Sequence, residues 1–218
     1  MMAPMRGIDW QTVVDDLASG FERLSAELEV EQAVVGLDGQ RELALHTLIE
    51  GCLRDAGYGV TRERRFPSER ARKRSAGRRC DFVLTRDGRP LVPDDAPALF
   101  DPVGAVSDAE AGWLEVTLVA QHRPLGASAG YAQRLQQPVW ADVTKLARDP
   151  GIHDAAVLLV LFTEDDATAS HDLAVWTRRA SERVLALWPR RERGLDIGDR
   201  LGNRRCRLAI FPLERPPR

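Results

Sequence analysis

The sequence predicts an α/β fold with a central mixed sheet flanked by helices. Segments of helical periodicity alternate with segments of strand character along the 218 residues. A continuous apolar run, AAVLLVLF at 155–162, is typical of a central strand covered on both faces. Polar and apolar residues alternate at 80–85 and at 113–121, which indicates strands with one mixed face.

Two helices are predicted before the first strand. Residues 9–29 carry one apolar stripe, and Asp38 is a candidate N-cap for a second helix that ends near Gly57. The two stripes contain Val13, Leu17, Phe21, Leu24 and Leu28, and then Leu45, Ile49, Cys52 and Ala56. We interpret 1–37 as a helical extension and 38–213 as the core of a single domain, residues 1–218.

Three strands are expected next, at 58–66, 78–85 and 113–121. The connection between the last two, 86–112, is rich in Pro, Gly and Asp. It is too long for an ordinary hairpin loop, which indicates a functional or partly structured segment.

The second half of the chain predicts helix, strand, helix and strand. The helix at 131–148 has an apolar face, and Pro138 is expected to kink or restart it. That face contains Leu135, Val139, Val143 and Leu146. A further helix is predicted at 172–188. The last strand, 204–213, is expected at a sheet edge, because Pro212 cannot donate a ladder hydrogen bond.

The composition indicates a soluble, cytoplasmic protein. The apolar fraction is 44%, the charged fraction is 29% and the net charge is −2, so the chain is not basic overall. No apolar run is long enough to span a membrane, and residues 1–10 lack the apolar stretch of a signal peptide. Cys52, Cys80 and Cys206 are scattered, which indicates a reducing compartment and gives no zinc-site spacing.

Arginine is concentrated in two stretches, 61–79 and 178–207, and a segment rich in Asp and Glu follows the first. Such runs often form a solvated face. Arginines beside carboxylates also suit a phosphate-binding rim next to a metal site. The residues predicted to contact a nucleic-acid backbone are Arg62, Arg64, Arg65, Arg72, Lys73, Arg74 and Arg78.

Two carboxylates interrupt the predicted strands. Glu115 shares a strand face with Trp113 and Thr117, and Asp81 lies on the mixed face of the preceding strand. Consecutive strands usually pair, so the two acids are expected to meet on one side of the sheet. Their oxygens would then suit one Mg²⁺ ion at about 2.0–2.1 Å. The alternative is that Glu115 simply lies on a solvent-facing side.

A third acid, Glu42, lies at the edge of the apolar stripe of the second helix. It is a candidate metal ligand. Alternatively, it is an acid in the first helical turn that favours the helix dipole.

This order of elements, with Asp81 in RRCDFVLT and Glu115 in WLEVT, resembles the PD-(D/E)xK nuclease superfamily. The resemblance covers residues 38–162 and implies a restriction-endonuclease-like core of order αβββαβ. It also implies that Asp81 and Glu115 bind one or two divalent metals, Mg²⁺ or Mn²⁺, with Glu42 as an outer member. In that superfamily a lysine two residues after the Glu handles the attacking water. Here Thr117 stands at that position.

A hydroxyl carries no positive charge, so the missing lysine is expected to cost about 10²–10³ in rate unless another cation replaces it. Lys145, on the predicted helix, is the candidate replacement; the alternative is a surface lysine whose stem covers apolar groups. Asp142 is expected to pair inside. Gln121 either orients water or is the polar end of a strand. The predicted catalytic set is Asp81, Glu115, Thr117, Gln121 and Lys145.

Together these residues favour a metal-dependent enzyme that hydrolyses phosphodiester bonds of nucleic acid, with DNA preferred as the substrate. The alternative is a catalytically degenerate domain of the same fold that binds nucleic acid or a protein partner. Under either interpretation, a second copy of the chain or another protein is a candidate partner. A structural protein with solvent-facing acids is the third interpretation. No membrane partner is expected. The G-x-S-x-G pattern at 126–130 is typical of serine hydrolases, but no predicted strand runs directly into Ser128.

Overall fold

The computed structural model describes residues 7–69, 77–92, 102–183 and 187–214. Its centre is a six-stranded sheet of order β1-β2-β3-β6-β8-β7, in which β3 and β6 are parallel and the other neighbours are antiparallel. The strands are β1 (Gly59–Arg65), β2 (Arg79–Thr85), β3 (Gly112–Ala120), β6 (Asp154–Thr163), β7 (Arg191–Asp196) and β8 (Arg205–Pro212); a separate hairpin contains β4 (His122–Arg123) and β5 (Gly126–Ala127).

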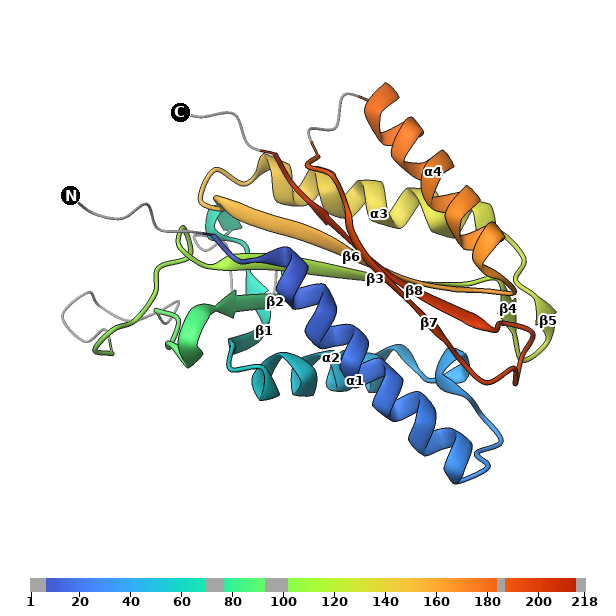
Figure 1. Ribbon diagram of the computed structural model, residues 1–218. Coiled ribbons are helices and arrows are strands. Elements are labelled where there is room, and N and C mark those ends of the chain that lie inside the picture. Colours follow the sequence, from blue (N-terminus) through green and yellow to red (C-terminus); the bar gives the residue numbers. More distant parts are fainter. Residues whose placement is uncertain (1–6, 70–76, 93–101, 184–186, 215–218) are drawn as a thin grey trace.

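Four helices flank this sheet (Figure 1). They are α1 (Trp10–Val30), α2 (Glu42–Asp55), α3 (Tyr131–Arg148) and α4 (Asp166–Glu182). Helices α1 and α2 cover one face, and α3 and α4 cover the other. The predicted α/β class with a mixed sheet is therefore confirmed, and the predicted order αβββαβ corresponds to α2, β1, β2, β3, α3 and β6.

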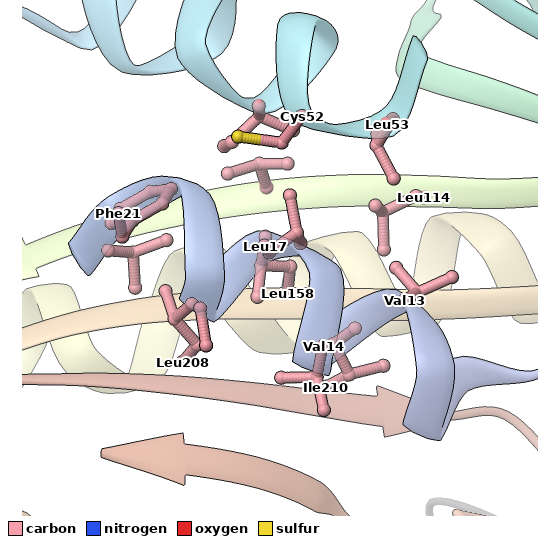
Figure 2. Close-up of a cluster of buried hydrophobic side chains, with 14 of the residues drawn as sticks. Val13, Val14, Leu17, Phe21, Cys52, Leu53, Leu114, Leu158, Leu208 and Ile210 are labelled. Atoms are coloured by element: carbon pink, nitrogen blue, oxygen red, sulfur yellow. The ribbon is translucent and has the colours of Figure 1, made fainter. Parts of the chain in front are cut away.

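Two apolar cores lie on the two faces of the sheet, and β6 contributes to both. Along β6, Leu158 belongs to the core under α1 and α2, whereas Leu159 belongs to the core under α3 and α4. This is the arrangement that a continuous apolar strand requires, because successive side chains point to opposite faces. Helix α1 packs Leu17 and Phe21 into the first core (Figure 2). Helix α1, which the sequence analysis assigns to an N-terminal extension, thus contributes to the core.

Asp9, the residue directly before helix α1, is the N-cap of that helix. The Asp9 carboxylate accepts hydrogen bonds from the Gln11 N–H at 3.0 Å and from the Thr12 hydroxyl at 3.0 Å. The hydrogen bond from Thr12 holds the pKa of Asp9 below its usual value. We expect Asp9→Ala to lower the free energy of unfolding by about 1 kcal/mol, because it leaves helical N–H groups without an acceptor. Urea denaturation checks this, and Asp9→Asn, which retains the acceptor, should lose much less.

Helix α2 differs from its predicted start. It begins at Glu42 with Arg41 as its N-terminal flanking residue, and Asp38 lies in a preceding 3-10 turn, Leu37–Gly39. Asp38 does not cap the helix because its carboxylate is buried and accepts a hydrogen bond from Asn203 Nδ2 at 2.7 Å. That partner is far away in the sequence, so local spacing could not indicate it.

Three predictions in the second half of the chain were wrong in part. Helix α3 runs through Pro138 without restarting. Helix α4 spans Asp166–Glu182 instead of 172–188, because the Asp165 side chain caps the Thr168 N–H at 2.7 Å. Strand β8 is an interior strand, since the charged β7 lies outside it. Pro212 is tolerated there because it is the last residue of β8.

Candidate functional site

The site begins where the pairing of β2 and β3 stops. The two strands pair at three positions, the last of them Phe82 with Leu114. Beyond that pair, side chains take over the ladder hydrogen bonds: Asp81 Oδ2 accepts from the Val116 N–H at 2.8 Å. Cys80 Sγ lies 3.4 Å from the Leu114 carbonyl oxygen. A carboxylate thus occupies a position between two strands that regular pairing would close.

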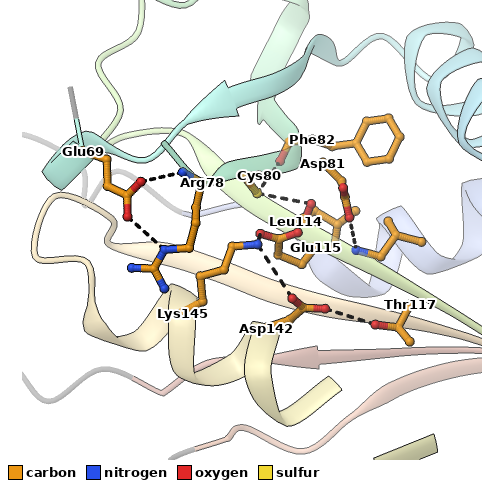
Figure 3. Close-up of polar contacts among 11 residues, drawn as sticks. Glu69, Arg78, Cys80, Asp81, Phe82, Leu114, Glu115, Thr117, Asp142 and Lys145 are labelled. Carbon is orange, nitrogen blue, oxygen red and sulfur yellow. Dashed lines mark hydrogen bonds and ion pairs between the residues drawn. The ribbon is translucent and has the colours of Figure 1, made fainter. Parts of the chain in front are cut away.

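Glu115 lies on the face of β3 that α3 covers, and its side chain is only 3% exposed. The alternative of a solvent-facing Glu115 is therefore wrong. Lys145 reaches from α3 to Glu115, with Nζ 2.5 Å from Oε1, and lies 3.8 Å from Asp142 Oδ1 (Figure 3). The Thr117 hydroxyl donates to Asp142 Oδ2 at 3.1 Å. Lys145 is therefore an inward-facing lysine, and Thr117 fixes one of its two acidic neighbours.

These side chains line one open pocket, which we call the site pocket. Its charged lining residues are Glu42, Arg79, Asp81, Glu115, Arg123, Arg134, Asp142 and Lys145. The two predicted strand acids, the predicted helix acid and Lys145 are thus brought together. Glu42 is exposed in the first turn of α2. It therefore lines the pocket and also lies where a negative charge favours the helix dipole, so the two interpretations of this residue are compatible.

Three further arginines line the site pocket: Arg79, which ends the predicted arginine-rich stretch, and Arg123 and Arg134, which the sequence analysis did not single out. Arg134 could have been predicted from its spacing, because it precedes Pro138 and Asp142 by one and two helical turns on α3. Arg123 could not have been predicted in this way, because it lies in the short β4–β5 hairpin, whose position depends on tertiary packing.

Two carboxyl groups of the site pocket, those of Glu115 and Asp142, have raised pKa values. Burial, and then the negative charge of Asp81, raise the pKa of Glu115 to about 8, although Lys145 partly offsets this. Burial also raises the pKa of Asp142. Burial lowers the pKa of Lys145, but the charges of Glu115 and Asp142 outweigh it and keep the pKa above its usual value. Burial and the charge of Asp81 therefore oppose the ionised form of Glu115, whereas the adjacent Lys145 ammonium favours it.

Several arginines predicted to bind phosphate serve the fold instead. Arg64 and Arg65 are 7% and 6% exposed, and they bind Asp108 at 3.0 Å and the Glu69 carbonyl at 2.8 Å. Arg62 pairs with Glu50 at 3.3 Å on the far side of the sheet. Because their guanidinium groups are used internally, these three positions do not form the predicted rim.

The remaining members of the predicted phosphate-binding group divide in two. Arg72, Lys73 and Arg74 lie outside the described residues. The Arg78 side chain is 65% exposed, although its Nε is 2.9 Å from Glu69 Oε1. Arg78 is therefore the member that the structure leaves facing solvent.

Gln121 does not reach the site pocket. Its Oε1 accepts a hydrogen bond from the Glu164 N–H at 2.9 Å, directly after the end of β3. Ser128 follows the two-residue strand β5, outside the main sheet, and its hydroxyl accepts from Arg134 at 2.7 Å. That position is not the turn of a central strand that a serine hydrolase needs.

Comparisons with family models, with curated proteins and with solved structures found no match for this chain. Within the described ranges, no group of three or more His, Cys, Asp or Glu side chains is arranged to hold a metal ion. No described helix is both long and apolar enough to cross a bilayer. The function therefore has to be argued from the chemistry of the site pocket.

Proposed function

We propose that this protein is a metal-dependent phosphodiesterase that cleaves DNA and that belongs to the PD-(D/E)xK type. One observation carries the proposal: Lys145 is in ion-pair contact with Glu115, in the pocket that Asp81 also lines. A cation from α3 thus stands beside the acid whose own strand offers only Thr117. The charge that is missing from the sequence motif is supplied by another element.

The donor set suits Mg²⁺ or Mn²⁺. Asp81 and Glu115 offer carboxylate oxygens only, and Mg²⁺ is commonly held by one or two carboxylates together with water and substrate phosphate. The absence of a three-ligand cluster among the described side chains is compatible with such a site. The charge of Asp81 helps to raise the pKa of Glu115, so the two acids repel one another. A divalent cation between them would relieve that repulsion.

Each neighbouring side chain has a task in this proposal. When bound, the metal would polarise the phosphate and acidify a water molecule. Lys145 would stabilise negative charge that develops on the attacked phosphate, and Asp142 keeps its ammonium group oriented. Thr117 holds Asp142 by a hydrogen bond. Arg79, Arg123 and Arg134 line the same pocket and would bind phosphate oxygens.

The proposal is tested by incubating the purified protein with labelled single- and double-stranded DNA in Mg²⁺, Mn²⁺ or EDTA. We expect cleavage with either metal and none in EDTA. Asp81→Asn should be inactive, although its side-chain oxygen can still accept from the Val116 N–H. Glu50→Gln is the control for loss of one carboxylate, because Glu50 pairs with Arg54 and Arg62 and lies outside the site pocket. Absence of cleavage by the wild type, or equal cleavage by Asp81→Asn, would contradict the proposal.

A second candidate function follows from the same ion pair. Lys145 already neutralises Glu115 without a metal, which is how a domain that has lost catalysis would stabilise its buried acid. In that case the protein would bind nucleic acid or a protein partner and would not cleave. Titration with Mn²⁺ separates the two functions, because the degenerate domain should neither bind the metal at Asp81 and Glu115 nor cut DNA.

A further inference from the structure

A second hollow, distinct from the site pocket, lies along α3 and α4 and carries cationic side chains without acids. We call it the basic groove. Its cationic lining residues are Arg78, Lys145, Arg148, Arg179 and Arg183. Its lining contains no Asp or Glu, although the net charge of the chain is −2. Three glutamines of α3, Gln133, Gln136 and Gln137, also line it and offer hydrogen-bond donors.

Three of the five cations of the basic groove have no acidic partner among the described residues, whereas Arg78 pairs with Glu69 and Lys145 pairs with Glu115. Arg148, Arg179 and Arg183 are exposed, and none of the three forms an ion pair with a residue in the described part of the chain. The Arg183 guanidinium is 3.8 Å from the centre of the Trp140 ring. Such a contact positions the guanidinium and leaves its N–H donors available at the ring edge. These arginines differ in this respect from Arg64 and Arg65.

The basic groove and the site pocket share one residue, Lys145. A chain of phosphates that lies in the groove would therefore arrive at the lysine beside Glu115. From this geometry we infer that the basic groove between α3 and α4 binds the sugar–phosphate backbone of a nucleic-acid strand and leads it to the site pocket. The inference rests on the proposed function for the second half of that statement. Of the arginine-rich segment at 61–79, Arg78 lines this groove, whereas Arg62, Arg64 and Arg65 are used elsewhere in the fold.

The test measures binding without cleavage. A short fluorescein-labelled DNA duplex is titrated with protein in EDTA, and fluorescence anisotropy gives Kd at several salt concentrations. We expect Arg148→Ala/Arg179→Ala to weaken binding by about tenfold or more at low salt. The slope of log K against log salt should become shallower by about 0.9 for each phosphate group that the variant no longer neutralises.

The control is a double variant with the same change in charge, Arg23→Ala/Arg178→Ala. Arg178 is the exposed neighbour of Arg179 on α4 but does not line the groove, and Arg23 lies on α1 over the opposite face of the sheet. It should change Kd by no more than about twofold to threefold, with an unaltered salt slope. Equal weakening by both double variants, or no weakening by either, would overturn the inference.

Two further outcomes keep this inference separate from the proposed function. If binding depends on Arg148 and Arg179 but no metal gives cleavage, the groove stands and the nuclease proposal fails. If DNA is cleaved in an Asp81-dependent manner while both double variants bind like the wild type, the nuclease proposal stands and the inference about the groove fails. Polyglutamate serves as the competitor: if it binds as tightly as DNA and loses affinity in the groove variant, the groove accepts an acidic protein segment and the inference is wrong.

Discussion

Replacing Lys145 with methionine is expected to lower the rate of metal-dependent DNA cleavage by about 10²–10³, the usual cost of removing one positioned charge from an active site. The Lys145 ammonium is the cation closest to Glu115 in the structure, at 2.5 Å, and the hydroxyl of Thr117 cannot take its place. Single-turnover kinetics at saturating protein measure the effect on the chemical step and exclude a change in DNA affinity.

The same variant should keep its metal site. Methionine removes an ammonium group that competes with a metal for the Glu115 carboxylate, so Mn²⁺ should bind Lys145→Met at least as tightly as the wild type. Thermal unfolding checks that the variant is folded. Arg178→Met is the control, because it also removes one positive charge and Arg178 is an exposed residue of α4 that lines neither pocket. Full activity in Lys145→Met would mean that this lysine only neutralises Glu115.

The site could be predicted from the sequence to the extent that it depends on local periodicity. Period-two alternation puts Glu115 and Thr117 on the same face of β3, and pairing of consecutive strands brings Asp81 to them. The helical period brings Lys145 to the flank of an apolar stripe, where both an inward and a solvent-facing orientation are compatible with the pattern. Only the packing of α3 against β3 decides between them.

What could not be predicted depends on partners that are distant in the chain. Arg64 belongs to an arginine-rich stretch with a composition typical of a phosphate-binding surface, yet it is buried against Asp108, 44 residues away. Strand β7, with the sequence RERGLD, has neither an apolar run nor a regular alternation, and it is a strand because β8 offers an edge to pair with. Its presence is also what makes β8 an interior strand.

The stability of the wild-type protein in EDTA is expected to fall by about 2–4 kcal/mol between about pH 5 and pH 8 through Glu115 alone. The pKa of Glu115 is about 8 in the folded protein, against 4.5 for the ordinary side chain, because the group is buried and faces Asp81. Within this window the folded protein retains a proton that the unfolded chain has released. Stability is therefore fully present below pH 4.5 and is lost as the pH rises through 8.

Urea denaturation across about pH 5–9 measures this, with Glu115→Gln as the comparison. Glutamine keeps the shape of the side chain and has no proton to lose. Burial also raises the pKa of Asp142, Asp38 and Asp154, so these groups lower the stability of both proteins as the pH rises. The difference between the two stability curves therefore isolates the contribution of Glu115. Parallel curves would mean that Lys145 keeps Glu115 ionised throughout the range.

The same proton links stability to the metal. A divalent ion at Asp81 and Glu115 requires the ionised carboxylate, so its binding should release the Glu115 proton and should tighten as the pH rises toward 8. Saturating Mn²⁺ should then remove most of the loss of stability seen in EDTA at high pH, and only in proteins that retain Glu115. If Mn²⁺ restores the stability of wild type and of Glu115→Gln equally, the metal binds elsewhere. The buried carboxyl group of Glu115 would then be stabilised by Lys145 and not by a metal.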